Sequence, residues 1–149
     1  MATLYFDTCA LVKRYYCEQG HQKVKNLIGV QNNDIVLSNI GAVEISSVLR
    51  KKYRTGDLSE TNAKKRLSRF IYDGQNSYKL FPVTRSVLGE GIGLVSKHDL
   101  RSLDAIHLAT ARDIQQDVQN FQFITSDKDL FDAADDENMQ PVDPEGNLP

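Results

Sequence analysis

Four carboxylate residues stand where the surrounding sequence is apolar or small. Asp7 ends the run TLYF, Glu44 lies within NIGAVEISSVL, Asp104 lies within LDAIHLA, and Asp127 follows FQFIT by two residues. Each acid alone has an ordinary structural explanation. Asp7 and Asp127 suit helix caps, and a carboxylate in a first helical turn, such as Asp104, gains about 0.3–1 kcal/mol from the helix dipole. The combination of four needs a further explanation.

Carboxylates gathered on one surface repel one another and raise each other's pKa. A bound divalent cation removes that cost. Ligation by Asp and Glu oxygens, with no Cys or His pattern nearby, favours Mg²⁺ or Mn²⁺ over Zn²⁺. Such an ion polarises a phosphoryl oxygen, lowers the pKa of a bound water and stabilises a leaving oxygen, which are the requirements of phosphodiester hydrolysis. The four acids therefore predict this chemistry if the fold brings them together.

Short apolar runs supply the elements that would position these acids. The runs at residues 3–6, 34–37, 79–83 and 121–125 contain β-branched or aromatic residues and predict strands. Longer helical patterns separate them, which is typical of an α/β fold with a mainly parallel sheet. In such sheets ligands bind beyond the carboxyl ends of the strands. Asp7 and Asp127 both follow strand ends, so we expect them at the same edge.

The helical segments carry recognisable start and stop signals. We expect a helix over Gly41–Tyr53 that stops at Gly56, and further helices capped by Ser59, Thr84, Ser102 and Asp127. The helix after Thr84 is expected to run through Val95, and a short strand or tail, MQPVD, follows the last helix. Glycines in GEGIG lack a preceding strand, so they predict helix packing and not a phosphate loop.

The length and composition predict one globular domain. The chain has 149 residues, 40% hydrophobic and 26% charged, so we expect a single domain over residues 1–149 with an acidic tail from about residue 135. No apolar run approaches the roughly 20 residues of a membrane span, and MATLYFDTC lacks a signal-peptide pattern, so we expect a cytoplasmic protein with no membrane partner. Two cysteines are too few for a disulfide framework or a zinc cage. We expect Cys9 in the core and Cys17 near the surface.

The formal net charge of −2 conceals an uneven distribution. Residues 1–100 carry 15 Lys and Arg against 9 Asp and Glu (+6), whereas residues 101–149 carry 3 against 11 (−8). The densest basic segment, Arg50–Arg69, contains eight basic and two acidic residues. Its candidate RNA- or partner-binding residues are Arg50, Lys51, Lys52, Arg54, Lys64 and Lys65. The alternative is two solvated helix faces on either side of a turn.

Other chemistries lack their sequence patterns. The chain contains no GxxxxGK[ST], GxGxxG or GxSxG segment. His107 follows Asp104 by one turn and is either a general base or, as we favour, a packed histidine bonded to backbone or carboxylate. Ser46 and Ser47 have no histidine nearby in sequence and do not predict a nucleophile.

The segments that hold the four acids resemble the PIN-domain family, specifically the VapC-like toxins of type II toxin–antitoxin pairs. FDTCALVKRY is similar to the family's opening element, LSNIGAVEISSVLRK to its Ser-x5-Glu helix, LRSLDAIHLATA to its LDA segment, and FITSDKDLFDAA to its closing T-x-D element. Their order and spacing also fit, at 37, 60 and 23 residues between successive acids. The resemblance covers nearly the whole chain.

The resemblance implies a three-layer α/β/α domain with a central mainly parallel sheet of four or five strands. It also implies that Asp7, Glu44, Asp104 and Asp127 are catalytic and metal-binding residues that hold Mg²⁺ or Mn²⁺ for RNA cleavage. Carried over by position, Thr8 supports Asp7 by hydrogen bonding and Thr125 orders the final loop. Ser38 either has a structural role or supports a metal-binding residue from behind. Asp129 is a weaker acidic candidate that instead suits a helix start.

The implied function is a metal-dependent endoribonuclease acting as a toxin. The implied partners are an RNA substrate, a small antitoxin protein and a second copy of the chain in a homodimer. Two other functions are open. One is a PIN-like RNA- or protein-binding module in RNA processing, with no toxin role. The other is a phosphohydrolase or receiver-like domain with an Asp nucleophile, although DTC lacks the Asp-x-Asp that a phosphohydrolase requires.

Overall fold

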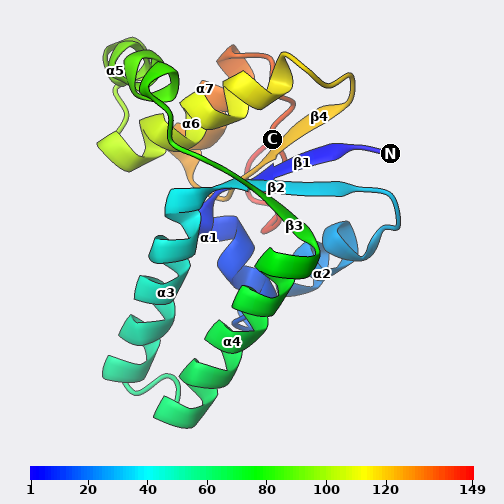
Figure 1. Ribbon diagram of the computed structural model, residues 1–149, viewed down its shortest axis with the longest axis vertical. Helices are drawn as coiled ribbons and strands as arrows, with labels where there is room; N and C mark the ends of the chain where they lie inside the picture. The colour runs from blue at the N-terminus through cyan, green and yellow to red at the C-terminus, as the bar shows by residue number, and fades with distance from the viewer.

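Four parallel strands form the central sheet of the computed structural model, which describes residues 1–149. They are β1 (Thr3–Phe6), β2 (Asp34–Ser38), β3 (Tyr78–Phe81) and β4 (Phe121–Ile124). They lie side by side in the order β3-β2-β1-β4 (Figure 1), and every pairing is parallel. This sheet confirms the predicted α/β class and its mainly parallel strands.

Helices cover both faces of the sheet, which confirms the three-layer prediction (Figure 1). One face carries α1 (Thr8–Leu11), the 3-10 helix η1 (Val12–Arg14), α2 (His21–Gly29), α3 (Asn39–Arg54) and α4 (Glu60–Asn76). The other carries α5 (Arg85–His98), α6 (Ser102–Gln115) and α7 (Lys128–Asp136). None of these helices combines the length and apolar character that a membrane crossing needs.

Side chains of β1 alternate between the two core clusters. Leu4 and Phe6 pack toward α1–α4, whereas Tyr5 packs toward α5–α7 and stacks on Phe123 with ring centroids 5.1 Å apart. Strands buried on both faces read as nearly continuous apolar runs, and this explains the pattern seen in the sequence. The rigid sheet then fixes the position of whatever follows each strand.

The ends of two strands differ from the prediction. β3 stops at Phe81 and not at residue 83, because Pro82 has no N–H for the ladder. β4 stops at Ile124, and the N–H of Thr125 donates to the carbonyl of Val142 at 3.1 Å. Val142 forms an isolated parallel bridge with Ile124, so the predicted MQPVD segment lies against the β4 edge of the sheet.

Most helix starts agree with the sequence. Ser59, Thr84 and Asp127 cap α4, α5 and α7 respectively, as predicted, and each side chain accepts a hydrogen bond from the backbone N–H three residues on. Gly56 has φ +82° and ends the α3 segment in the left-handed conformation that glycine favours. The helix after Thr84 extends beyond Val95 to His98.

Two helix starts were placed wrongly. Ser102 is not a cap: Arg101 holds the extended N-cap conformation, and Ser102 is the first helical residue of α6. The side chain of Arg101 makes no capping bond and turns instead toward nearby carboxylates. α3 begins at Asn39, two residues before the prediction, because the Ser38 side chain accepts from the N–H of Ile40 at 3.3 Å.

Candidate active site

The four predicted acids line one cavity of about 190 Å³ at the carboxyl edge of the sheet. Asp7 follows β1 and caps α1, while Asp127 follows β4 and caps α7. Glu44 projects from α3, and Asp104 lies in the first turn of α6. The structure thus brings together all four side chains from four segments of the chain. Their companions in the cavity wall are Thr8, Cys9, Val48, Arg101 and His107.

Asp7 is the most enclosed of the four, with 4% of its surface exposed. One carboxylate oxygen accepts from the N–H of Ala10 at 2.8 Å, and the other accepts a short hydrogen bond from the Thr125 hydroxyl. Burial raises the pKa of Asp7, while the Thr125 bond, the nearby His107 and the Ala10 bond act in the opposite direction. The hydrogen bonds therefore fix the position of this carboxylate, whereas burial disfavours its negative charge. A cation bound beside Asp7 would compensate for that unfavourable charge.

The predicted role of Thr8 was wrong. Its hydroxyl donates to Glu44 at 2.8 Å and makes no hydrogen bond with the neighbouring Asp7. Thr8 is the first residue of α1, and this position turns its side chain toward α3. Thr125 supports Asp7 instead, and its hydroxyl also accepts from the N–H of Asp127 at 3.1 Å, which orders the final loop as predicted.

Glu44 ends a hydrogen-bonded chain that begins in the sheet. The buried Tyr5 hydroxyl lies 2.7 Å from Nδ1 of His107, and Nε2 of His107 lies 2.6 Å from Oε1 of Glu44. Burial alone raises the pKa of Glu44, but the bond to His107, its charge and the Thr8 bond outweigh burial and lower the pKa. His107 is a packed histidine bonded to a carboxylate, as the sequence favoured, and it orients Glu44.

Arg101 bridges the other two acids. Its Nε lies 3.1 Å from Oδ2 of Asp104, and its Nη2 lies 3.4 Å from Oδ2 of Asp127. Burial raises the pKa of Asp104; Arg101 counteracts this rise and Asp127 adds to it. The arginine side chain is 80% exposed, so this cation reaches the cavity from the solvent side.

Sequence reasoning missed three participants in this site. Arg101 precedes Asp104 by three residues, and that spacing on a helix start is the signal that could have identified it. Tyr5 gave no signal, because an aromatic residue in a buried strand is ordinary. Cys9 was expected in the core but is exposed at the cavity wall, with its Sγ 3.2 Å from each Asp7 oxygen. Desolvation of the Sγ atom and the charge of Asp7 raise the pKa of this thiol. Cys17 is exposed as predicted.

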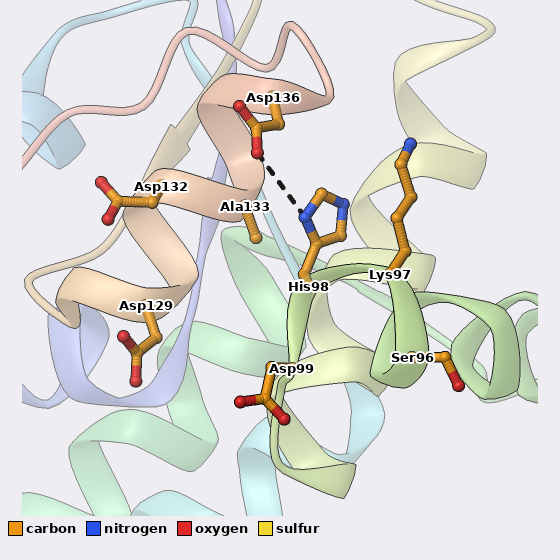
Figure 2. Close-up of a pocket in the computed structure, with 8 residues that line it drawn as sticks. All are labelled: Ser96, Lys97, His98, Asp99, Asp129, Asp132, Ala133 and Asp136. Carbon is orange, nitrogen blue, oxygen red and sulfur yellow. Dashed lines mark ion pairs between the residues drawn. The ribbon is translucent and has the colours of Figure 1, made fainter.

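The remaining predicted residues lie outside the cavity wall. Ser38 is fully buried and caps α3, a structural role. Asp129 lies in the first turn of α7, where it faces a separate, larger hollow between α5 and α7 (Figure 2). In that hollow Nδ1 of His98 lies 3.7 Å from Oδ2 of Asp136 (Figure 2). Lys97, also in its wall, pairs with Glu137, which does not line the hollow.

The predicted basic residues lie on α3 and α4, away from the acids. Arg50 lies over the ring of Tyr53 at 4.7 Å, and Lys52 lies over the ring of Tyr16 at 4.3 Å. Lys64 pairs with Glu60 within α4. The others are Lys51 and Arg54 in the last turn of α3 and the exposed Lys65 on α4. None of the six lines the acidic cavity.

The chemistry of the donors fits Mg²⁺ or Mn²⁺. Four carboxylates supply the hard oxygen ligands that these ions prefer. In the present arrangement no three acidic, histidine or cysteine side chains stand close enough to hold an ion. Two of the carboxylates turn toward Arg101, whose exposed side chain is free to withdraw into solvent and release them.

A family model described as PIN domain matches residues 4–137, which is most of the chain. The chain belongs to the PIN-domain family. Within that family it is similar to Ribonuclease VapC47 of Mycobacterium tuberculosis, with 30% identity over 136 residues, 88% of this chain and 89% of VapC47.

Solved structures confirm the PIN fold. The chain superposes on Mycobacterium tuberculosis VapC20, a toxin that cleaves the sarcin-ricin loop, with a TM-score of 0.67 and 16% identity, covering 87% of this chain and 94% of VapC20. It is also similar to a toxin–antitoxin complex from Klebsiella pneumoniae, with a TM-score of 0.61 and 20% identity, covering 95% of this chain and 97% of that one. At these identities the likeness concerns the fold.

Proposed function

We propose that this PIN-domain protein is a Mg²⁺- or Mn²⁺-dependent endoribonuclease and the toxin of a toxin–antitoxin pair. The observation that carries the proposal is the single cavity lined by Asp7, Glu44, Asp104 and Asp127. The relative VapC47 is named a ribonuclease, and this supports RNA as the substrate. Carboxylates that hold a divalent metal ion can activate water for phosphodiester hydrolysis.

The chain's own residues hold and orient the proposed ligands. Thr125 and the N–H of Ala10 fix the Asp7 carboxylate, and Thr8 and His107 fix that of Glu44. A bound divalent cation supplies activation of water and stabilisation of charge on the phosphate. Asp7, Glu44, Asp104 and Asp127 would hold it, in place of the Arg101 guanidinium that two of them now contact.

The proposed partners follow from the relatives. The Klebsiella pneumoniae protein was solved as a toxin–antitoxin complex, and this supports an antitoxin for this chain. We extend the proposal to a homodimer, in keeping with the family resemblance. The Arg101 guanidinium lies between Asp104 and Asp127, so the cavity accommodates an arginine side chain. An antitoxin could insert an arginine at the same place and block the site.

The test is RNA cleavage by the purified protein with Mn²⁺, and with EDTA as the metal-free control. Asp7→Asn keeps the side-chain shape but removes the charge, so we expect a folded protein with at least 100-fold less cleavage, roughly the loss seen when a key catalytic interaction is removed. The matched control is Asp132→Asn, because Asp132 is an exposed acid on α7 that pairs with Lys128 and lies outside the cavity. Full activity in Asp7→Asn would overturn the proposed site, and RNA binding without cleavage in the unmutated chain would favour a binding module.

A further inference from the structure

A second polar pocket lies between η1 and α4, apart from the acidic cavity. It has a volume of about 300 Å³ and is lined by Arg14, Tyr15, Asn62, Lys65, Arg66 and Arg69. Four of its six lining residues are cationic and none is acidic. We call it the arginine pocket. Lys65, Arg66 and Arg69 belong to the basic segment Arg50–Arg69, although only Lys65 was a candidate binding residue. Arg14 comes from a distant segment that the fold brings against α4.

The cations of the arginine pocket are mostly unneutralised. Arg14, Lys65 and Arg66 make no ion pair within the chain, and only Arg69 has one, to Asp73 at 3.1 Å. Arg66 donates from Nη1 to the carbonyl of Tyr15 at 2.9 Å, but its Nε is buried and has no partner. That Nε is the one buried side-chain nitrogen or oxygen of the chain without a hydrogen bond. A buried donor without a protein partner leaves a hydrogen bond for a water, an ion or a ligand to make.

The floor of the pocket is rigid. Tyr15 is buried, its hydroxyl donates to Asp73 at 2.7 Å, and its ring packs edge-on against Phe70 with centroids 5.5 Å apart. Because Asp73 also holds Arg69, the same buried network sets the position of two sides of the pocket. Guanidinium groups fixed in this way lose little entropy on binding a ligand.

We propose that the arginine pocket binds a backbone phosphate of RNA, at a site separate from the acidic cavity. Planar guanidinium forks match the oxygens of a phosphate, and unpaired cations supply the charge. The inference rests on the proposed ribonuclease function for its choice of polyanion. Two observations favour RNA over an acidic protein segment: the short chain segment that joins the pocket to the catalytic edge, and the exposed Tyr72 beside Arg69.

The connection to the catalytic edge is direct. Asp7 caps α1, and η1 continues from α1 and carries Arg14 seven residues later. Helical rise over that length separates the backbones of Asp7 and Arg14 by roughly 10–12 Å, a short distance compared with an RNA strand of several nucleotides. One exposed tyrosine lies beside a cation of the pocket: Arg69 lies over the ring of Tyr72, which is 57% exposed. Exposed aromatic rings beside a basic groove are typical of surfaces that bind single-stranded nucleic acid.

The test measures binding of a fluorescein-labelled 12-nucleotide uridine RNA by anisotropy, in EDTA, over a series of salt concentrations. Arg14→Gln/Lys65→Gln removes two pocket cations that make no ion pair or hydrogen bond within the chain. We expect roughly tenfold weaker binding and a salt slope smaller by about 0.7, the value for one phosphate contact on a single strand. The matched control is Lys23→Gln/Lys25→Gln, which removes the same charge from the exposed face of α2 and should change affinity less than about twofold.

A second variant distinguishes a pocket that recognises phosphate through guanidinium geometry from a surface that attracts RNA by charge alone. Arg66→Lys keeps the charge but loses the planar fork and the buried Nε, so we expect weaker RNA binding by a variant that stays folded at the assay temperature despite losing the bond to the Tyr15 carbonyl. Equal affinity in the pocket and control variants, or no RNA binding by the unmutated chain, would overturn the inference. Unchanged RNA binding with weaker binding of a poly-glutamate peptide would also overturn it and assign the pocket to an acidic protein. RNA cleavage with Mn²⁺ tests the ribonuclease proposal, whereas RNA binding in EDTA tests the arginine pocket, so the failure of one can be distinguished from the failure of the other.

Discussion

Replacing Thr125 with valine is the sharpest perturbation of the candidate site that leaves every carboxylate in place. Valine keeps the shape of the fully buried threonine and removes only its hydroxyl. That hydroxyl donates to Asp7 and accepts from the N–H of Asp127. Through these two bonds Thr125 links Asp7, at the end of β1, to Asp127, which follows β4.

The expected loss of stability follows from these two bonds. A hydrogen bond to a charged group contributes about 1.5–3 kcal/mol, and a neutral one about 0.5–1.5 kcal/mol. Thr125→Val should therefore lower the free energy of unfolding by about 2–4 kcal/mol, or shift the urea midpoint down by roughly 1–2 M. The matched control is Thr3→Val, a buried threonine of β1 whose hydroxyl holds no carboxylate, and we expect its midpoint to stay close to that of the unmutated chain.

Metal binding should change in the same variant. The Thr125 bond lowers the pKa of Asp7, so its loss lets burial raise that pKa further. A proton then competes more strongly with the cation, and we expect Mn²⁺ affinity to fall roughly 10- to 100-fold by isothermal titration calorimetry, as for other residues that support a metal ligand. A variant with unchanged stability and unchanged Mn²⁺ affinity would refute the role assigned to Thr125.

Three further results are expected. Tyr5→Phe removes the buried hydroxyl that lies 2.7 Å from His107 and should lower the free energy of unfolding in urea by about 1–3 kcal/mol. An unchanged urea midpoint would argue against the hydrogen-bonded chain from Tyr5 through His107 to Glu44. Burial raises the pKa of Asp7 in the folded state, so its contribution to stability is present below the ordinary Asp pKa and is lost as pH rises through the folded value. The free energy of unfolding of Asp7→Asn should therefore fall less than that of the unmutated, metal-free chain over that rise in pH. The same pH dependence in both proteins would contradict the raised pKa of Asp7. Arg101→Gln removes the cation that contacts Asp104 and should tighten Mn²⁺ binding by calorimetry; weaker binding would show that Arg101 assists the metal.

Placement of the acids could be predicted because it depends on topology. Asp7 and Asp127 follow neighbouring parallel strands, and parallel strands end at the same edge of the sheet. Glu44 and Asp104 stood out as acids in apolar helical segments, which indicates a side chain that the fold must accommodate. The match to the PIN family confirmed the fold that the alternating pattern indicated.

Side-chain partners could not be predicted in the same way. Thr8 follows Asp7 directly, and sequence proximity favoured a bond between them, but the first turn of α1 directs Thr8 to Glu44. Thr125 supports Asp7 from 118 residues away, and only the β1–β4 register brings the two together. The arginine pocket likewise joins Arg14 to α4 through packing that no local pattern encodes.

Diffraction from crystals of the protein grown with Mn²⁺, measured at a wavelength where manganese scatters anomalously, tests the central claim most directly. The account predicts an anomalous peak in the cavity lined by Asp7, Glu44, Asp104 and Asp127, with the Arg101 side chain withdrawn from its present bridge. A peak only in the hollow between α5 and α7, with the acidic cavity still bridged by Arg101, would contradict it.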